Sequence, residues 1–220
     1  MNYPVEGLHQ FGVQAAMRMG VSRQDAENLL KNVLTADMRG VHSHGFSRFG
    51  GYLKRMRLGT TSPTAHPTLL RESPSALAFD GNAGLGTTIG IDVMTACIEH
   101  ARQTGCCVAT VKNGSHYGFG GYYAMYAAEQ GMIGIAAANA AALVTPFGGA
   151  KGMLGTNPLS IAVPGGQGPQ FVLDMATSEA AMGKIDLAYR EGKQIPDTWA
   201  LDSEGHRTTD PGRVVGHKGA

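Results

Sequence analysis

Several patterns are missing from this sequence, and each absence excludes a class of protein. No run of eighteen apolar residues occurs, so we predict no membrane span. The formal net charge is only +1 and no block of Lys and Arg is present, which argues against a nucleic-acid partner. The chain starts without a basic segment followed by an apolar one, so we expect no signal peptide and a cytoplasmic protein.

Cysteine is scarce, and the motifs of several enzyme classes are absent. The three cysteines, Cys97, Cys106 and Cys107, are odd in number and two are adjacent, which fits reduced thiols better than a disulfide framework. No Gly-x-Ser-x-Gly elbow or Walker loop occurs, and no Gly-x-Gly-x-x-Gly fingerprint opens a helix. The sequence therefore does not predict a nucleophile-elbow hydrolase, and any nucleotide would be bound in a non-Rossmann way.

The residues that are present predict a folded chain of mixed α/β class. Apolar residues make up 43% of the 220 positions and charged residues 16%, which is enough to form a core. Apolar periodicity predicts three helices, within about 6–19, 22–38 and 47–58, and then strands alternating with helices up to Gly192. A connector rich in Thr, Ser and Pro lies at 60–76. We therefore predict an N-terminal helical domain over 1–76 and an α/β domain over 77–220.

The stretch from Arg39 to Tyr52, "RGVHSHGFSRFGGY", carries the first candidate site. A loop that leads into a helix N-terminus favours anions, and the arginine fork of Arg48 suits a carboxylate. Tyr52 lies one turn further along the same helix face. A neutral His44 could exchange a proton at working pH. The alternative is a polar loop without a functional role, and the pattern alone supports both interpretations about equally.

Three later stretches place polar groups where ligands gather. "NGSHYG" holds Ser115 and His116 after a predicted strand, where a histidine is well placed for acid–base chemistry, although a structural histidine is the alternative. "GGAKGMLGTNP" has glycines that would let the backbone approach a phosphate or a flat ring. "DMATS" places Asp174 at a strand end, either lining a cofactor site or followed by Ser178 as a helix cap.

A zinc site is a further hypothesis. His42, His44 and His116 could supply three nitrogen ligands. His42 and His44 are separated by one residue in a loop, and neither Cys-x-x-Cys nor His-Glu-x-x-His occurs in the chain. We therefore expect no metal here.

Six stretches, in order and over nearly the whole chain, resemble one known family. They are "ADMRGVHSHGFSRFGGYLKRMRLG", "VKNGSHYGFGGYY", "PFGGAKGMLGTNPLSIAVP", "FVLDMATSEAAMGKI", "IPDTWALDSEGHRTTDP" and the final "GHKG". Together they look like the type-2 malate/L-lactate dehydrogenase family. The resemblance implies an oxidoreductase that moves a hydride between NAD or NADP and a small 2-hydroxy or 2-keto acid. It also implies a non-Rossmann cofactor-binding sheet domain over 77–220, a helical substrate and dimerisation domain over 1–76, and a homodimer.

The resemblance also implies roles for particular residues. His116 is expected as the acid/base, with His44 polarising the substrate, although either histidine could exchange the proton. Arg48 resembles the carboxylate anchor, with Ser43 and Tyr52 nearby. The residues that resemble cofactor contacts are Asn139, Thr156, Asn157, Asp174, Met175, Ala176 and Lys218.

One departure from the family pattern concerns length. Family chains continue well beyond "GHKG", whereas here only Ala220 follows, and the apolar run that usually precedes the motif is missing. We therefore expect a chain that is C-terminally truncated. The alternative function is an inactive family remnant that at most dimerises. The sequence leaves open which 2-oxo acid is used and whether the cofactor is NAD or NADP.

Overall fold

The computed structural model describes residues 3–215, and these divide into two compact units. The first unit comprises the chain up to Gly134 together with Ile161–Val172, and the second comprises Ile135–Ser160 together with the chain from Leu173 onward. Helices and two small sheets alternate along the chain, which confirms the predicted mixed α/β class. The division into a helical domain over 1–76 and a cofactor domain over 77–220 stays a prediction.

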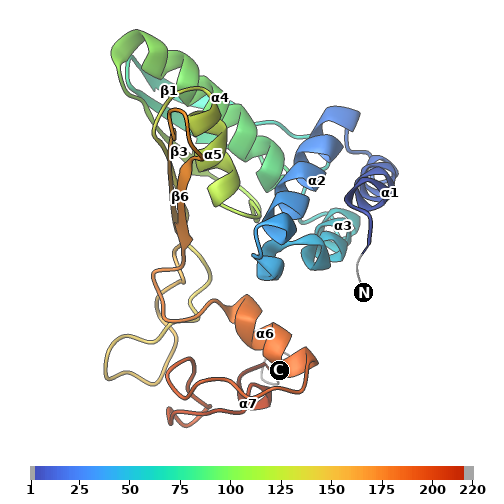
Figure 1. Cartoon of the computed structure of the whole chain (residues 1–220), viewed down its shortest axis with the longest axis vertical. Coiled ribbons are helices and arrows are strands. Elements are labelled where there is room, and N and C mark those ends of the chain that lie inside the picture. Colours follow the sequence, from blue (N-terminus) through green and yellow to red (C-terminus); the bar gives the residue numbers. More distant parts are fainter. Residues whose placement is uncertain (1–2, 216–220) are drawn as a thin grey trace. The chain divides into compact units, whose positions relative to one another are not determined.

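Three helices at the start of the chain share one core (Figure 1). They are α1 (Val5–Met17), α2 (Arg23–Met38) and α3 (Phe49–Arg57). Ser22 caps α2, because its side chain accepts a hydrogen bond from the Asp25 backbone N–H at 3.1 Å. The apolar stripe of α2 is fully buried at Leu29, Leu30 and Val33. This core makes α2 the central helix of the group.

The first sheet lies behind helix α4 (Gly86–Thr104) in the order β1-β2-β3. Its strands are β1 (Thr68–Ser73), β2 (Ala76–Asp80) and β3 (Val108–Lys112), with β1 antiparallel and β3 parallel to β2. α4 packs on one face, where Leu77 and Phe79 meet Ile89 and Val93. The predicted connector over 60–76 was wrong at β1. All six of its residues are exposed and its register shifts between Leu69 and Arg71, so the strand shows no apolar alternation.

Helix α5 (Gly121–Glu129) leads into the second sheet. Its strands are β4 (Gly134–Ala137), β5 (Leu159–Val163) and β6 (Phe171–Met175), in that order across the sheet. The sequence predicted strands in this part of the chain. The division between the two units passes within all three strands. Within the first unit, Phe119, Ala124 and Ala162 form a core that also includes Ala36 of α2. Through this core α2 is linked to the chain that surrounds α5.

The alternative of Ser178 as a helix cap was wrong. α4 begins at Gly86 after Leu85, without a side-chain cap. α6 (Met182–Arg190) begins after Ala181 rather than at Ser178, whose hydroxyl donates instead to the Ala180 carbonyl at 2.9 Å. A further short helix, α7 (Gly212–Val215), lies beyond Gly192, where the sequence predicted no element. Within residues 3–215 no helix combines the length and apolarity needed to cross a membrane.

Candidate functional site

The first arm of the candidate site is the segment 42–48, which we call the His44 loop. It folds as two short 3-10 turns, η1 (His42–His44) and η2 (Phe46–Arg48), between α2 and α3. Asp37 near the end of α2 holds it, because its carboxylate accepts the Phe46 backbone N–H at 2.7 Å and lies 3.0 Å from His42 Nδ1. A Cβ atom at Gly45 would lie 1.9 Å from Asp37 Oδ1, so any larger residue would have to displace this carboxylate.

The polar side chains of the His44 loop are organised around Ser43. The Ser43 hydroxyl lies 3.0 Å from His44 Nδ1, and Arg48 Nε donates to the Ser43 carbonyl at 2.8 Å. Within residues 3–215 the two terminal nitrogens of the Arg48 guanidinium form no hydrogen bond to protein. This arrangement fixes one edge of the guanidinium and leaves the fork that pairs well with a carboxylate.

The second arm is the segment 113–119, which we call the His116 loop and which follows β3. Ser115 anchors it to the start of α4, because its hydroxyl accepts the Gly86 backbone N–H at 2.9 Å and donates to the Gly84 carbonyl at 2.8 Å. Ser115 therefore supports the loop and is fully engaged in doing so.

The two arms meet at the imidazole of His116. Its Nδ1 lies 2.9 Å from the Tyr52 hydroxyl and 3.1 Å from the Gly118 backbone nitrogen, which donates to it. The rings of His44 and His116 are nearly parallel, with centroids 5.9 Å apart and planes inclined by 18°. The structure therefore brings together His44, His116 and Tyr52, which the sequence singled out, while their chemical roles stay predictions.

Charge and burial disfavour a proton on His116. The pKa of His116 is lowered to about 4, first by desolvation and then by the positive charges of His44, Arg55 and Arg48. The residue keeps an exposed side, where solvent screens these charges. Burial also raises the pKa of Tyr52, although Arg48 and Arg55 act in the opposite direction. Both side chains are therefore neutral near pH 7.

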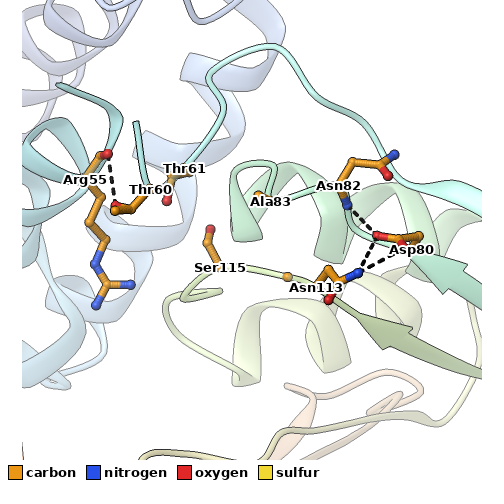
Figure 2. Close-up of a pocket in the computed structure, with 9 residues that line it drawn as sticks. Arg55, Thr60, Thr61, Asp80, Asn82, Ala83, Asn113 and Ser115 are labelled. Atoms are coloured by element: carbon orange, nitrogen blue, oxygen red, sulfur yellow. Dashed lines mark hydrogen bonds between the residues drawn. The ribbon is translucent and has the colours of Figure 1, made fainter. Parts of the chain in front are cut away.

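A polar cleft of about 720 Å³ lies beside the His116 loop (Figure 2). It is lined by Arg55, Thr60, Thr61, Asp80, Asn82, Ala83, Asn113, Gly114 and Ser115. Figure 2 shows the Asp80 carboxylate held by the Asn82 backbone N–H and by the Asn113 side chain, at distances of 2.9 to 3.1 Å. These hydrogen bonds lower the pKa of Asp80. The Asp80 carboxylate in the cleft wall thus already has hydrogen-bond partners within the protein.

The residues predicted to contact a cofactor lie in the second unit, in three segments joined by hydrogen bonds. The Asn157 side chain accepts the Ala140 backbone N–H at 3.1 Å, and the Thr177 N–H donates to the Thr156 carbonyl at 2.9 Å. The Asp174 carboxylate accepts a short hydrogen bond from Ser160. These bonds place Thr156 and Asn157 between the segments that carry Asn139 and Asp174–Ala176.

This cluster fits a nicotinamide cofactor in its chemistry. Asn139 and Met175 are exposed and Thr156 and Ala176 are half-buried, so amide, hydroxyl and apolar surface are all available to a flat, amide-bearing ring. A Cβ at Gly155 would lie 2.5 Å from the Ala140 carbonyl oxygen, which shows how closely the backbone segments approach. Lys218 lies outside the described residues.

Sequence reasoning missed two residues that position the site, Asn32 and Asp37 of α2. Asn32 is fully buried and hydrogen-bonded to the chain after His116. The available signal was a carboxamide on the apolar stripe of a helix, where an unpaired polar group would be costly. His42, proposed as a zinc ligand, lies beside Asp37. Residues 3–215 contain no group of three or more His, Cys, Asp or Glu side chains arranged to hold a metal.

A folded chain of mixed α/β class with two paired histidines and an arginine fork matches one known family. The model of the malate/L-lactate dehydrogenase family matches residues 3–220, and the chain belongs to this family.

Relatives and a solved structure agree with this assignment. The chain is 40% identical to a malate dehydrogenase of Pyrococcus abyssi over 93% of its own length and 56% of that protein. It is 37% identical to an L-sulfolactate dehydrogenase of Methanocaldococcus jannaschii over 92% and 59%. The crystal structure of a malate dehydrogenase from Entamoeba histolytica covers 99% of this chain with a TM-score of 0.95 and 32% identity, and 60% of that chain is covered. The chain thus spans less than two thirds of the length of these relatives.

Proposed function

We propose that this chain is an oxidoreductase that transfers a hydride between a nicotinamide cofactor and a small 2-hydroxy or 2-keto acid. The observation that carries the proposal is the pairing of His44 and His116 beside the open fork of Arg48, in a chain of this family. The relatives named malate and L-sulfolactate dehydrogenase act on acids of this kind, which supports the substrate class.

Arg48 binds the substrate carboxylate in this proposal. Its Nε is held by the Ser43 carbonyl, so the fork is oriented before the substrate arrives. The two parallel hydrogen bonds that a guanidinium makes to a carboxylate then fix the direction of the neighbouring C2 atom. Ser43 is thereby a support for the anchor, through its carbonyl, and a neighbour of His44, through its hydroxyl.

One imidazole exchanges a proton with the C2 oxygen of the substrate, and the other polarises the C2 carbonyl. When the carbonyl is reduced, its oxygen gains charge that a proton must neutralise, and when the alcohol is oxidised the same proton leaves. His116 and His44 are both candidates for this exchange, with Tyr52 bonded to the first and Ser43 to the second.

When bound, the nicotinamide supplies or accepts the hydride. We assign its contacts to Asn139, Thr156, Asn157, Asp174, Met175, Ala176 and Lys218, as the family resemblance implies. NAD and NADP are both retained. A homodimer, a helical substrate and dimerisation domain over 1–76 and a cofactor-binding domain over 77–220 belong to the same proposal.

The test uses the 220-residue chain as it stands. NADH and NADPH are titrated while their fluorescence and the melting temperature are followed, and oxidation is then assayed with pyruvate, oxaloacetate and sulfopyruvate. We expect saturable binding, a raised melting temperature and turnover with at least one acid. Absence of a fluorescence change, of a thermal shift and of turnover would contradict the proposal and favour an inactive member of the family.

Arg48 provides the sharper variant. Arg48→Gln should raise the KM for the acid by about 10- to 100-fold, since each hydrogen bond to a charged group contributes roughly 1.5–3 kcal/mol. Arg57→Gln is the matched control, because Arg57 is an exposed arginine at the end of α3, the helix that Arg48 directly precedes. An equal KM in the two variants would remove Arg48 from the substrate site.

A further inference from the structure

Asn32 is a buried carboxamide whose hydrogen bonds are made to the chain just after His116. Its Oδ1 accepts the Phe119 backbone N–H at 2.9 Å, and its Nδ2 donates to the Phe119 carbonyl at 3.2 Å. Nδ2 also lies 3.3 Å from the Tyr123 hydroxyl, to which it donates. The side chain is fully buried. Asn32 of α2 thus bonds both the N–H and the carbonyl of Phe119, as a neighbouring backbone would in a sheet.

The conformation of Gly118 and its lack of a side chain allow Asn32 to make these hydrogen bonds. Its φ of +79° belongs to the left-handed region, and a Cβ atom there would lie 2.2 Å from Asn32 Oδ1. The Asn32 carboxamide can therefore occupy its position only because residue 118 is a glycine. With the turn held this way, the Gly118 N–H is directed at His116 Nδ1, 3.1 Å away.

A backbone N–H can only donate, so His116 Nδ1 must accept and carries no hydrogen. The neutral ring consequently has its proton on Nε2. The Tyr52 hydroxyl, 2.9 Å from the same Nδ1, is then a second donor to that nitrogen. Within residues 3–215 His116 Nε2 has no hydrogen-bond partner, so this N–H remains available to a ligand.

We propose that Asn32 is a positioning residue that, through the Gly118 turn, fixes His116 as the Nε2–H tautomer, so that His116 presents a hydrogen-bond donor to the substrate oxygen. Protonating Nδ1 would require the Gly118 N–H to be displaced, and the positive charges of His44, Arg48 and Arg55 oppose it further. The titratable hydroxyl facing the ring is that of Tyr52.

The consequence for the reaction rests on the proposed function. A neutral His116 that released its only N–H proton would become an imidazolate, which is strongly unfavourable. His116 therefore polarises the carbonyl by hydrogen bonding. The proton that ends on the substrate oxygen in reduction comes from a protonated His44, whose N–H bond breaks as the O–H bond forms. In oxidation the same proton returns to neutral His44.

The tautomer is measured by NMR on the chain labelled with ¹⁵N-histidine, without substrate or cofactor, and His116 is assigned by its loss in His116→Gln. At pH 7 we expect a bare Nδ1 and a protonated Nε2. In Asn32→Ala we expect a mixture of tautomers and a pKa that rises from about 4 toward about 6.5. A proton on Nδ1 in the wild type, or unchanged His116 signals in Asn32→Ala, would overturn the proposal.

Thr88→Val is the matched control for a general loss of packing. The Thr88 hydroxyl is also buried in the first unit, and it donates to Asp25 at 3.0 Å rather than to the Gly118 turn. Its removal should leave the tautomer unchanged, and equal changes in both variants would reduce Asn32 to a structural role. Should Asn32→Ala not fold, the wild-type tautomer still decides the assignment, and Gly118→Ala tests the same link.

Turnover provides a second, independent measurement. With a 2-keto acid, Asn32→Ala should lower kcat about 10-fold or more while KM changes little, because Arg48 still binds the carboxylate. An Nε2–H tautomer in a chain without any turnover would leave the positioning intact and defeat the proposed function. Turnover with a proton on Nδ1 would do the reverse.

Discussion

The His44 loop and the His116 loop are both held from α2, but by groups of different chemistry. Asp37 holds the His44 loop with a carboxylate that remains 31% exposed at its side chain. Asn32 holds the His116 loop with a carboxamide that is completely buried. A neutral amide can be buried once its hydrogen bonds are satisfied, whereas a buried carboxylate would carry a large desolvation cost.

The two imidazoles do not follow their anchors in exposure. Asn32 and Phe119 are buried, but His116 itself is exposed at the surface and His44 is half-buried. The pKa of His116 is nevertheless lowered, first by desolvation and then by nearby positive charges. The His44 loop keeps a charged anchor in contact with water. Helix α2 thus holds the His116 loop through a buried amide and the His44 loop through a partly exposed carboxylate.

The largest expected effect is loss of turnover on removing either imidazole. His116→Ala and His44→Ala should each lower kcat by about a hundredfold or more, because His44 transfers the proton and His116 stabilises the charge on the substrate oxygen by a hydrogen bond. Steady-state assays with NADH or NADPH and the best 2-keto acid measure this. His42→Ala, which removes an exposed histidine of the same loop, should change kcat little. Turnover near wild type in both of the first two variants would show that neither imidazole takes part.

Replacing Gly118 or Gly45 with alanine should lower the free energy of unfolding by different amounts in the two loops. Gly118→Ala should lower the free energy of unfolding by about 1–3 kcal/mol, because its backbone is left-handed and the added Cβ also meets the Asn32 carboxamide. Gly45 has an ordinary φ of −80°, so Gly45→Ala collides only with the Asp37 carboxylate and should cost about 1 kcal/mol. Urea unfolding provides both values.

Double variants sharpen this contrast. Adding Asp37→Ala to Gly45→Ala removes the obstacle, so the two changes should be clearly non-additive. Adding Asn32→Ala to Gly118→Ala removes the clash with the carboxamide but leaves the left-handed backbone in place and the Phe119 hydrogen bonds unmade, so stability should not return to the wild-type value. Recovery in the second pair and not in the first would reverse our assignment of the two causes.

The pH dependence of stability should show the state of His116. Its folded pKa of about 4 is below the value of about 6.5 expected in the unfolded chain. The unfolded state therefore binds the proton first, and the contribution of His116 is present above pH 6.5 and is lost as the pH falls toward 4. Unfolding of the wild type should weaken more steeply over this window than that of His116→Gln. Equal slopes would indicate an unshifted pKa.

The sequence predicted the elements that show their own periodicity, and it missed those that depend on distant partners. Leu29, Leu30 and Val33 mark α2 by spacing alone. Asn32 lies on the same stripe, but its partner Phe119 is 87 residues away, so no local pattern indicates the contact. The predicted site residues of the first unit were named from motifs and family resemblance, and only the fold places their rings side by side.

A third histidine, His66, has a pKa that is shifted in the opposite direction from that of His116. His66 lies 2.8 Å from Asp92 of α4 and 3.5 Å from Asp25 of α2, and the hydrogen bond to Asp92 raises its pKa. Its stabilising effect is therefore complete below pH 6.5 and is lost as the pH rises through the raised pKa.

His66 is more than half exposed at its side chain, so this is the smallest effect we predict, about 0.2–1 kcal/mol. His66→Gln should lower stability at pH 6 and have little effect at pH 9, whereas His116→Gln should alter the slope only on the acid side. Added salt should weaken the His66 effect more, because His66 and Asp92 are exposed to water, whereas the first cause of the shift at His116 is desolvation, which salt does not screen. A His66 effect that grows with pH would contradict the ion pairs on which this expectation depends.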